Sequence, residues 1–192
     1  MDPGHAATFD RQRAALTTAL QPYHDRIAAI RGQSAGRKVG ATENIFVYLA
    51  DALGLDLISP PEFMQAVAEG TDPPASTVAE FQQQVSEKQI GVLVVNTQTT
   101  TAVTTNLKQL AVGAGIPVVG ISETLQPVGA SFQAWQNQQL PALQAALSRA
   151  QRAMERHVDS VLAAIHAVGG SLERVAHEFV MKDAQELRPS AC

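Results

Sequence analysis

Cysteine is almost absent from this chain of 192 residues: its one cysteine, Cys192, is the last residue. A lone cysteine cannot close a disulfide within the chain, and it excludes a thiolate metal cluster. Long apolar runs are missing too, since no stretch approaches the roughly 20 residues that a membrane-spanning helix needs. The first ten residues, MDPGHAATFD, lack the basic and apolar regions of a signal peptide. The sequence by itself therefore predicts a soluble chain without an export signal of its own.

An excess of basic charge is also lacking. Charged residues make up 17% of the chain, the formal net charge is -4 at pH 7, and lysine and arginine are scattered. This distribution excludes the basic surface that binds nucleic acid or an anionic membrane. Hydrophobic residues make up 45%. A chain of this length and composition can form one domain with a good core, or one domain with an appendage.

Short apolar segments alternate with amphipathic ones along the middle of the chain. Strands are predicted for KVGAT (38–42), LDLIS (55–59), IGVLVVNT (90–97) and PVVGI (117–121). Helices are predicted over 44–54, the first half of 62–76, 77–88 with Ser76 as N-cap, and 101–112. This order is typical of the α/β class, with an open four-stranded parallel sheet flanked by helices. The continuous apolar run at 90–97 predicts a central strand covered on both faces.

Helical patterns lie on either side of the predicted sheet. A long amphipathic helix is expected over 5–30, with a kink or break at Pro22, followed by the loop GQSAG at 32–36. A second long helix begins near Ser131, and a helical tail with a break at Gly169-Gly170 follows residue 150. The predicted organisation is a helix and loop at 1–36, an α/β lobe at 37–150 and a helical C-terminal extension at 151–192.

Two of the four predicted strands are followed by a glutamate: Glu43 follows the first and Glu123 the fourth. Ligands of an open parallel sheet bind outside the carboxyl ends of its strands, and neighbouring strands lie only about 4.8 Å apart. Two carboxylates that converge there repel each other unless a proton or a cation lies between them, and a divalent cation fits. Each glutamate can equally be a negative charge in the first turn of a helix, which the helix dipole favours by about 0.3–1 kcal/mol. The pattern alone leaves both interpretations open.

Other motifs give weaker support for a site. GQSAG matches the G-x-S-x-G nucleophile elbow, but a helix precedes it where a strand is required, so Ser34 is predicted to be a loop residue. VGAGIPVVG lacks the glycine spacing of dinucleotide-binding loops, and no P-loop is present. The five histidines are dispersed and without metal-site spacing, which predicts surface positions.

The order of several segments resembles the C-terminal half of the zinc- and manganese-type solute-binding proteins of ABC transporters. DPGHAATFDRQRAAL resembles the start of the long helix that connects their two lobes, and VGATENIFVYLADALGLDLISPPEF resembles the first strand, helix and strand of their second lobe. AEGTDPPASTVAEFQQQVSEKQIGVLVVNTQ and AGIPVVGISETLQPVGASFQAWQNQQLPAL are similar to later parts of that lobe. The resemblance covers about residues 2–147.

The resemblance implies a metal ion held between two lobes, with no catalysis. The second lobe supplies one ligand after its first strand and an acidic ligand after its last, and these positions correspond to Glu43 and Glu123. The first lobe, with its two histidines, lies outside this chain, so we expect weak binding of Zn²⁺ or Mn²⁺ by this chain alone. An ABC permease as partner and an extracytoplasmic location are further implications of the resemblance.

Two other functions remain open from the sequence. One is a stand-alone flavodoxin-like domain that binds a small ligand or a protein at the same edge of the sheet, without a role in transport. The other is a small α/β hydrolase that uses Ser34, which a fluorophosphonate probe would label; we expect no labelling.

Overall fold

The computed structural model describes residues 3–186, with side chains described from residue 4 to residue 166. The chain divides into two compact units, Met1–Gln151 and Arg152–Cys192. The first unit contains the sheet and the helices that pack on it. The helix α6 (Phe132–Glu186) begins in the first unit and supplies the helical residues of the second.

The sheet has four parallel strands: β1 (Lys38–Ala41), β2 (Asp56–Leu57), β3 (Leu93–Asn96) and β4 (Val118–Ile121). Their order is β2-β1-β3-β4, which confirms the predicted open α/β sheet and the internal position of the strand at 93–96. Strand β2 is shorter than predicted. The amide of Ala41 donates to the Ser59 side chain (2.7 Å) instead of a backbone carbonyl, and Pro60 has no N–H to continue the ladder.

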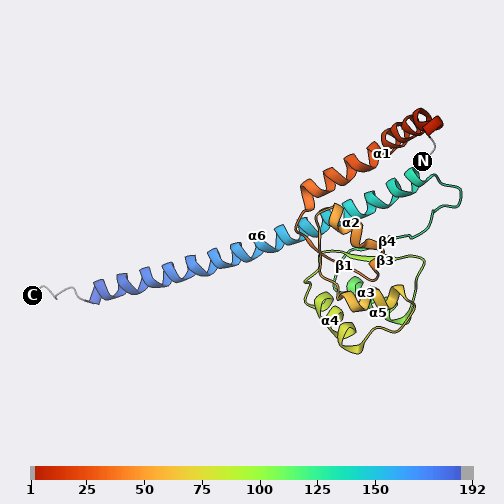
Figure 1. The fold of residues 1–192 in the computed structure, drawn as a ribbon. Helices are drawn as coiled ribbons and strands as arrows, with labels where there is room; N and C mark the ends of the chain where they lie inside the picture. Colours follow the sequence, from red (N-terminus) through yellow and green to blue (C-terminus); the bar gives the residue numbers. More distant parts are fainter. Residues whose placement is uncertain (1–2, 187–192) are drawn as a thin grey trace, which may run out of the picture. The chain divides into compact units, whose positions relative to one another are not determined.

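Side chains alternate between two apolar clusters, one on each face of the sheet, because successive residues of a strand point to opposite faces. Val39, Val94 and Ile121 lie in the first cluster, with residues of α1 (Ala6–Ser34), α2 (Val47–Ala52) and the start of α6. Leu93 lies in the second, with residues of α3 (Pro61–Ala68), α4 (Ala75–Ser86) and α5 (Ala102–Gly113). Helices therefore cover both faces (Figure 1).

Helix α1 is continuous through Pro22, and it ends at Ser34. Of the predicted kink or break at Pro22, the break is therefore wrong, and the loop predicted at 32–36 begins only after Ser34, a helical residue that is 5% exposed. Packing extends the helix: Ile30 is fully buried, and the Arg31 guanidinium donates to the carbonyl of Ala52 (3.1 Å) at the end of α2.

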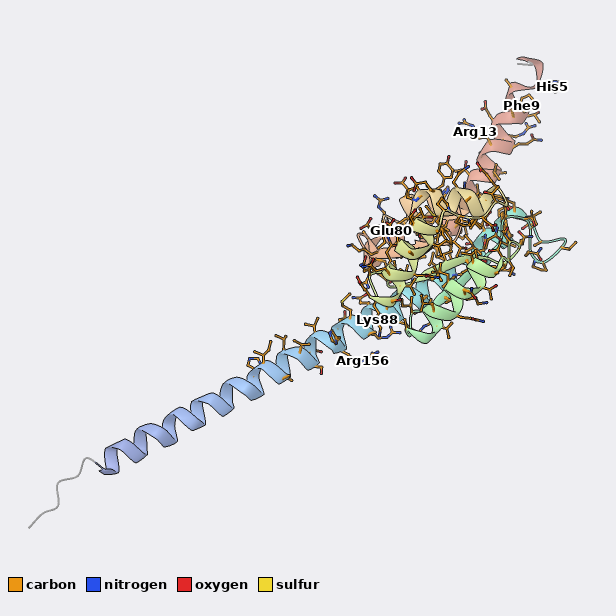
Figure 2. The ribbon with its side chains drawn as sticks, turned by 90° about the horizontal axis from the view of Figure 1, so that it is seen from below. His5, Phe9, Arg13, Glu80, Lys88 and Arg156 are labelled. Atoms are coloured by element: carbon orange, nitrogen blue, oxygen red, sulfur yellow. The ribbon has the colours of Figure 1, made fainter. Side chains whose placement is uncertain are left out.

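The first half of α1 is exposed, although its apolar residues are spaced for burial. Phe9 is 57% exposed and Leu16 is 49% exposed. Figure 2 shows Phe9 and Arg13 on this half of the helix. The apolar side of the predicted amphipathic helix therefore contacts the core only in its second half, at Tyr23, Ile27 and Ile30.

Two further helix predictions are wrong. Helix α4 begins at Ala75, and the residue before it is Pro74, whose carbonyl accepts from Thr77 and Val78; Ser76 lies within the helix and is not its N-cap. Helix α6 is continuous through Gly169-Gly170. A glycine costs a helix about 1 kcal/mol, against about 3 kcal/mol for proline, so glycine does not force a break. In the described part of the chain, no helix is long and apolar enough to cross a membrane.

Candidate metal-binding edge of the sheet

The register of the strands brings the exits of β1, β3 and β4 to one edge of the sheet. Ala41 pairs with Val94, and Asn96 pairs with Ile121. Glu43 follows Ala41 by two residues, as Asn96 follows Val94, so Glu43, Asn96 and Ile121 lie at one level. Two strand spacings, about 10 Å, separate the exits of β1 and β4. Glu123 follows Ile121 by two residues and lies at the same edge of the sheet.

Glu43 is a buried carboxylate, with 5% of the residue exposed. Its Oε2 accepts a hydrogen bond of 2.7 Å from Nδ2 of Asn96. No lysine, arginine or histidine of the described residues forms an ion pair with it. Glu43 precedes the short 3-10 helix η2 (Asn44–Phe46), but its side chain makes no capping hydrogen bond there. The carboxylate is therefore directed to β3 and not to the amides of the helix that follows it.

Glu123 is exposed and lies in the loop between β4 and α6. No helix begins directly after it, since α6 starts at Phe132. Glu123 therefore does not lie in the first turn of a helix, and its interpretation as a charge favoured by the helix dipole does not apply. The backbone of this loop is held in place: the amides of Glu123 (2.8 Å) and Thr124 (2.9 Å) both donate to Oε1 of Gln98.

The exit of β3 connects the two glutamate-bearing exits. Asn96 donates to Glu43, and its own Oδ1 accepts from the amide of Gln98 (2.9 Å). Gln98 in turn accepts from the loop of Glu123 and donates from Nε2 to the hydroxyl of Thr124 (2.6 Å). Asn96 lies at the end of the predicted strand 90–97 and Gln98 directly follows it, but the sequence does not reveal these roles. Their amide side chains, which donate and accept at once, were the available signal.

A cavity of about 530 Å³ opens beside Glu123, between α1, α2, the end of β4 and the start of α6. Its lining is largely apolar and aromatic, with Tyr23, Ile27, Leu49 and Trp135 among the members. Trp135 is 9% exposed, and its indole N–H donates to the hydroxyl of Ser122 (2.8 Å). Such a cavity is within the size range of small-ligand sites.

The cavity includes Glu123 but not Glu43, so the two predicted ligands do not share it. Glu123 shares it with His24 of α1, which had been predicted as a surface residue and is exposed. Among residues 4–166, no group of three or more histidine, cysteine or acidic side chains is placed to hold a metal ion. In the described part of the chain, this edge of the sheet therefore carries one carboxylate, Glu43, held by Asn96, and a second, Glu123, whose backbone is held by Gln98, but not a complete coordination shell.

Residues 1–146 match the family described as zinc-uptake complex component A, periplasmic (ZnuA). The chain belongs to this family. The membership confirms the family that the order of the segments had predicted. A comparison with curated proteins gives no match.

Solved structures have the same fold. The solute-binding protein FpvC from Pseudomonas aeruginosa, solved with Mn²⁺, aligns with a TM-score of 0.58 and 14% identity over 77% of this chain and 54% of its own. The laminin-binding protein Lmb of Streptococcus agalactiae aligns at 0.56 with 18% identity, over 76% and 54%. The periplasmic zinc-binding protein TroA from Treponema pallidum aligns at 0.57 with 12% identity, over 76% and 54%. This chain thus spans about half the length of these solved structures.

Proposed function

We propose that this chain binds a divalent metal ion at the carboxyl edge of its sheet, with Glu43 and Glu123 as ligands. The burial of Glu43 without a cationic partner carries the proposal. A buried carboxylate is costly unless it is paired or hydrogen-bonded. A single amide donor offsets only part of this cost, and a divalent cation would offset more because it brings two positive charges.

The two carboxylates differ in mobility, and this suits capture of an ion. Asn96 holds Glu43 in one orientation, whereas no hydrogen bond to the carboxylate of Glu123 is recorded among the described residues. Glu123 can therefore move toward an ion that Glu43 holds. Oxygen ligands favour hard ions such as Mn²⁺; FpvC was solved with Mn²⁺, and TroA is described as zinc-binding. Two ligands predict weak binding, since tight zinc sites use four ligands and hard cations often more.

The biological role that we propose is that of the second lobe of a solute-binding protein for metal import. Family membership supports it, and so does the span of about half a relative. In this role a first lobe supplies the remaining ligands, a permease receives the ion, and the protein works outside the cytoplasm. The ion is cargo, and no reaction is catalysed.

Metal titration of isosteric variants tests the site. Zn²⁺ and Mn²⁺ are titrated by calorimetry into the wild type, Glu43→Gln, Glu123→Gln and the double variant. The emission of Trp135, the only tryptophan, provides a second signal because Trp135 lines the cavity with Glu123. Each single variant should lower the affinity at least tenfold, and the double variant should abolish binding.

Glu62→Gln is the matched control, because Glu62 is an exposed glutamate in the first turn of α3. It should bind like the wild type. Equal binding by the wild type and the double variant would refute the ligand assignment. An equal loss in the Glu62 variant would show that net charge alone explains the binding.

The cavity supports a second candidate, a stand-alone flavodoxin-like domain that binds a small apolar ligand or a protein without a role in transport. Its aromatic lining and its separation from Glu43 favour this candidate. It predicts that ligands change the emission of Trp135 in the Glu43→Gln variant as they do in the wild type. It also predicts that ligand binding does not depend on added metal.

A further inference from the structure

The second unit carries a regular apolar stripe on helix α6. Met154, Val158, Val161 and Ile165 follow one another at spacings of four, three and four residues. Their exposed fractions are 68%, 47%, 44% and 60%. Residues at these spacings lie on one face of a helix, so the described part of the stripe is an exposed apolar face.

The sequence continues the same spacing beyond residue 166. Positions 168, 172, 175 and 179 hold Val168, Leu172, Val175 and Phe179, and the helix is continuous through these positions. Alternate steps of three and four residues, sustained over eight apolar positions, form a heptad repeat. A repeat of 3.5 residues is the pattern of a coiled-coil seam, since it keeps one narrow stripe facing a partner helix.

This helix needs a partner for stability. A lone helix in water is marginal, and most helix stability in proteins comes from packing of an apolar face. The adjacent glycines Gly169 and Gly170 lower its stability further, because glycine is a poor helix former. The match to the solute-binding family covers residues 1–146, so the stripe lies outside the part that the family accounts for.

We propose that a second copy of this chain covers the stripe, as an antiparallel two-stranded coiled coil centred between residues 166 and 167. The stripe is complementary to itself in this orientation. Position 154 of one copy stands at the level of position 179 of the other, 158 at that of 175, 161 at that of 172, and 165 at that of 168. All eight apolar positions then face an apolar position.

The residues that flank the stripe favour the antiparallel orientation over the parallel one. Antiparallel pairing puts Leu162, which is 49% exposed, beside Gly169 of the other copy, where the small residue leaves room. It also puts His157 beside Glu178 of the other copy. Parallel pairing would put Glu178 beside Asp183 of the other copy, and like charges at such positions repel.

The stripe contains neither Glu43 nor Glu123, so a test of this interface is independent of the proposed metal binding.

Molar mass in solution tests the pairing. The chain has a mass of 20.4 kDa, and sedimentation equilibrium should give twice this value for the wild type. Ile165→Glu puts a charge in the stripe and should give 20.4 kDa. Ala163→Glu puts the same charge on the opposite face of the same helix and should remain dimeric. Circular dichroism confirms that each variant is folded.

A monomeric wild type over the whole concentration range would overturn the proposal. A dimer that persists in Ile165→Glu, or one that is lost equally in Ala163→Glu, would also overturn it. Spin labels on Ala184→Cys, in a Cys192→Ser background, test the orientation. Antiparallel copies place the labels about 50 Å apart at 1.5 Å per residue, and parallel copies place them within about 25 Å. The short distance would refute the antiparallel register.

Discussion

Asn96 holds Glu43: its side-chain amide donates a hydrogen bond of 2.7 Å to the carboxylate, across the exits of two adjacent strands. Both residues are 5% exposed, so water contributes little to solvating the charge. The bond gives Glu43 one orientation before any ligand arrives. A preset orientation lowers the entropic cost of binding, so Asn96 is a positioning residue for the proposed metal site.

Removal of this donor should destabilise the protein. Asn96→Leu leaves a buried carboxylate without its hydrogen bond, which should lower the free energy of unfolding by about 1.5–3 kcal/mol. Urea denaturation measures the change. The double variant Glu43→Gln/Asn96→Leu should recover part of this loss, because burying an unpaired neutral amide costs less free energy than burying an unpaired carboxylate. Additive losses in this double-mutant cycle would show that the two side chains are not coupled.

Gln98 should act on the site through the backbone of the loop at Glu123. Gln98→Leu removes the acceptor of two amides and the donor to Thr124, all at exposed positions, so we expect a loss of about 0.5–1.5 kcal/mol in the free energy of unfolding. The affinity for metal should fall with it, since the loop loses its fixed position. Gln82→Leu, at an exposed position on α4, is the control and should change neither quantity. Unchanged metal affinity in Gln98→Leu would separate this loop from the site.

Gly40 should not tolerate a side chain. A Cβ at this position in β1 would lie 2.8 Å from Ile90 and 2.9 Å from Phe81, both fully packed in the second cluster. Gly40→Ala should therefore lower the free energy of unfolding by about 1–3 kcal/mol through overpacking. Gly32→Ala is the matched control, because a Cβ there meets nothing within 4 Å and the residue is helical. This variant should gain about 0.5–1 kcal/mol. The same sign in both variants would contradict the packing argument.

The stability of the fold should fall in alkaline solution because of Tyr23. Burial raises the pKa of Tyr23 above its ordinary value of 10.0. The unfolded chain then ionises at a lower pH than the folded one, so stability is complete below about pH 10 and is lost as the pH rises through the raised pKa. Tyr23→Phe should flatten this loss in urea denaturation between pH 9 and pH 11. Tyr48→Phe, at a residue that is 87% exposed, should keep the dependence of the wild type. Identical curves for all three proteins would rule out Tyr23 as the cause.

Much of the fold follows from local pattern. The apolar runs that begin at Lys38 and Ile90 predicted strands, and the strand exits predicted Glu43 and Glu123 at one edge of the sheet, because parallel strands share one direction. Errors occurred where a residue was read without its neighbours in space. Ser34 is one case: it is helical because α1 packs to its end, and Pro22 does not interrupt that helix.

The sequence by itself determined the α/β class, the order of the segments and the heptad spacing of the tail, since all three depend on periodicities along the chain. Only the tertiary structure decided that Glu43 is buried against Asn96, which lies 53 residues further along the chain, and that Glu123 opens onto a cavity without Glu43. The physical reason is that the burial and hydrogen bonding of a side chain depend on strand register. Register brings together residues whose separation in sequence carries no signal of their contact.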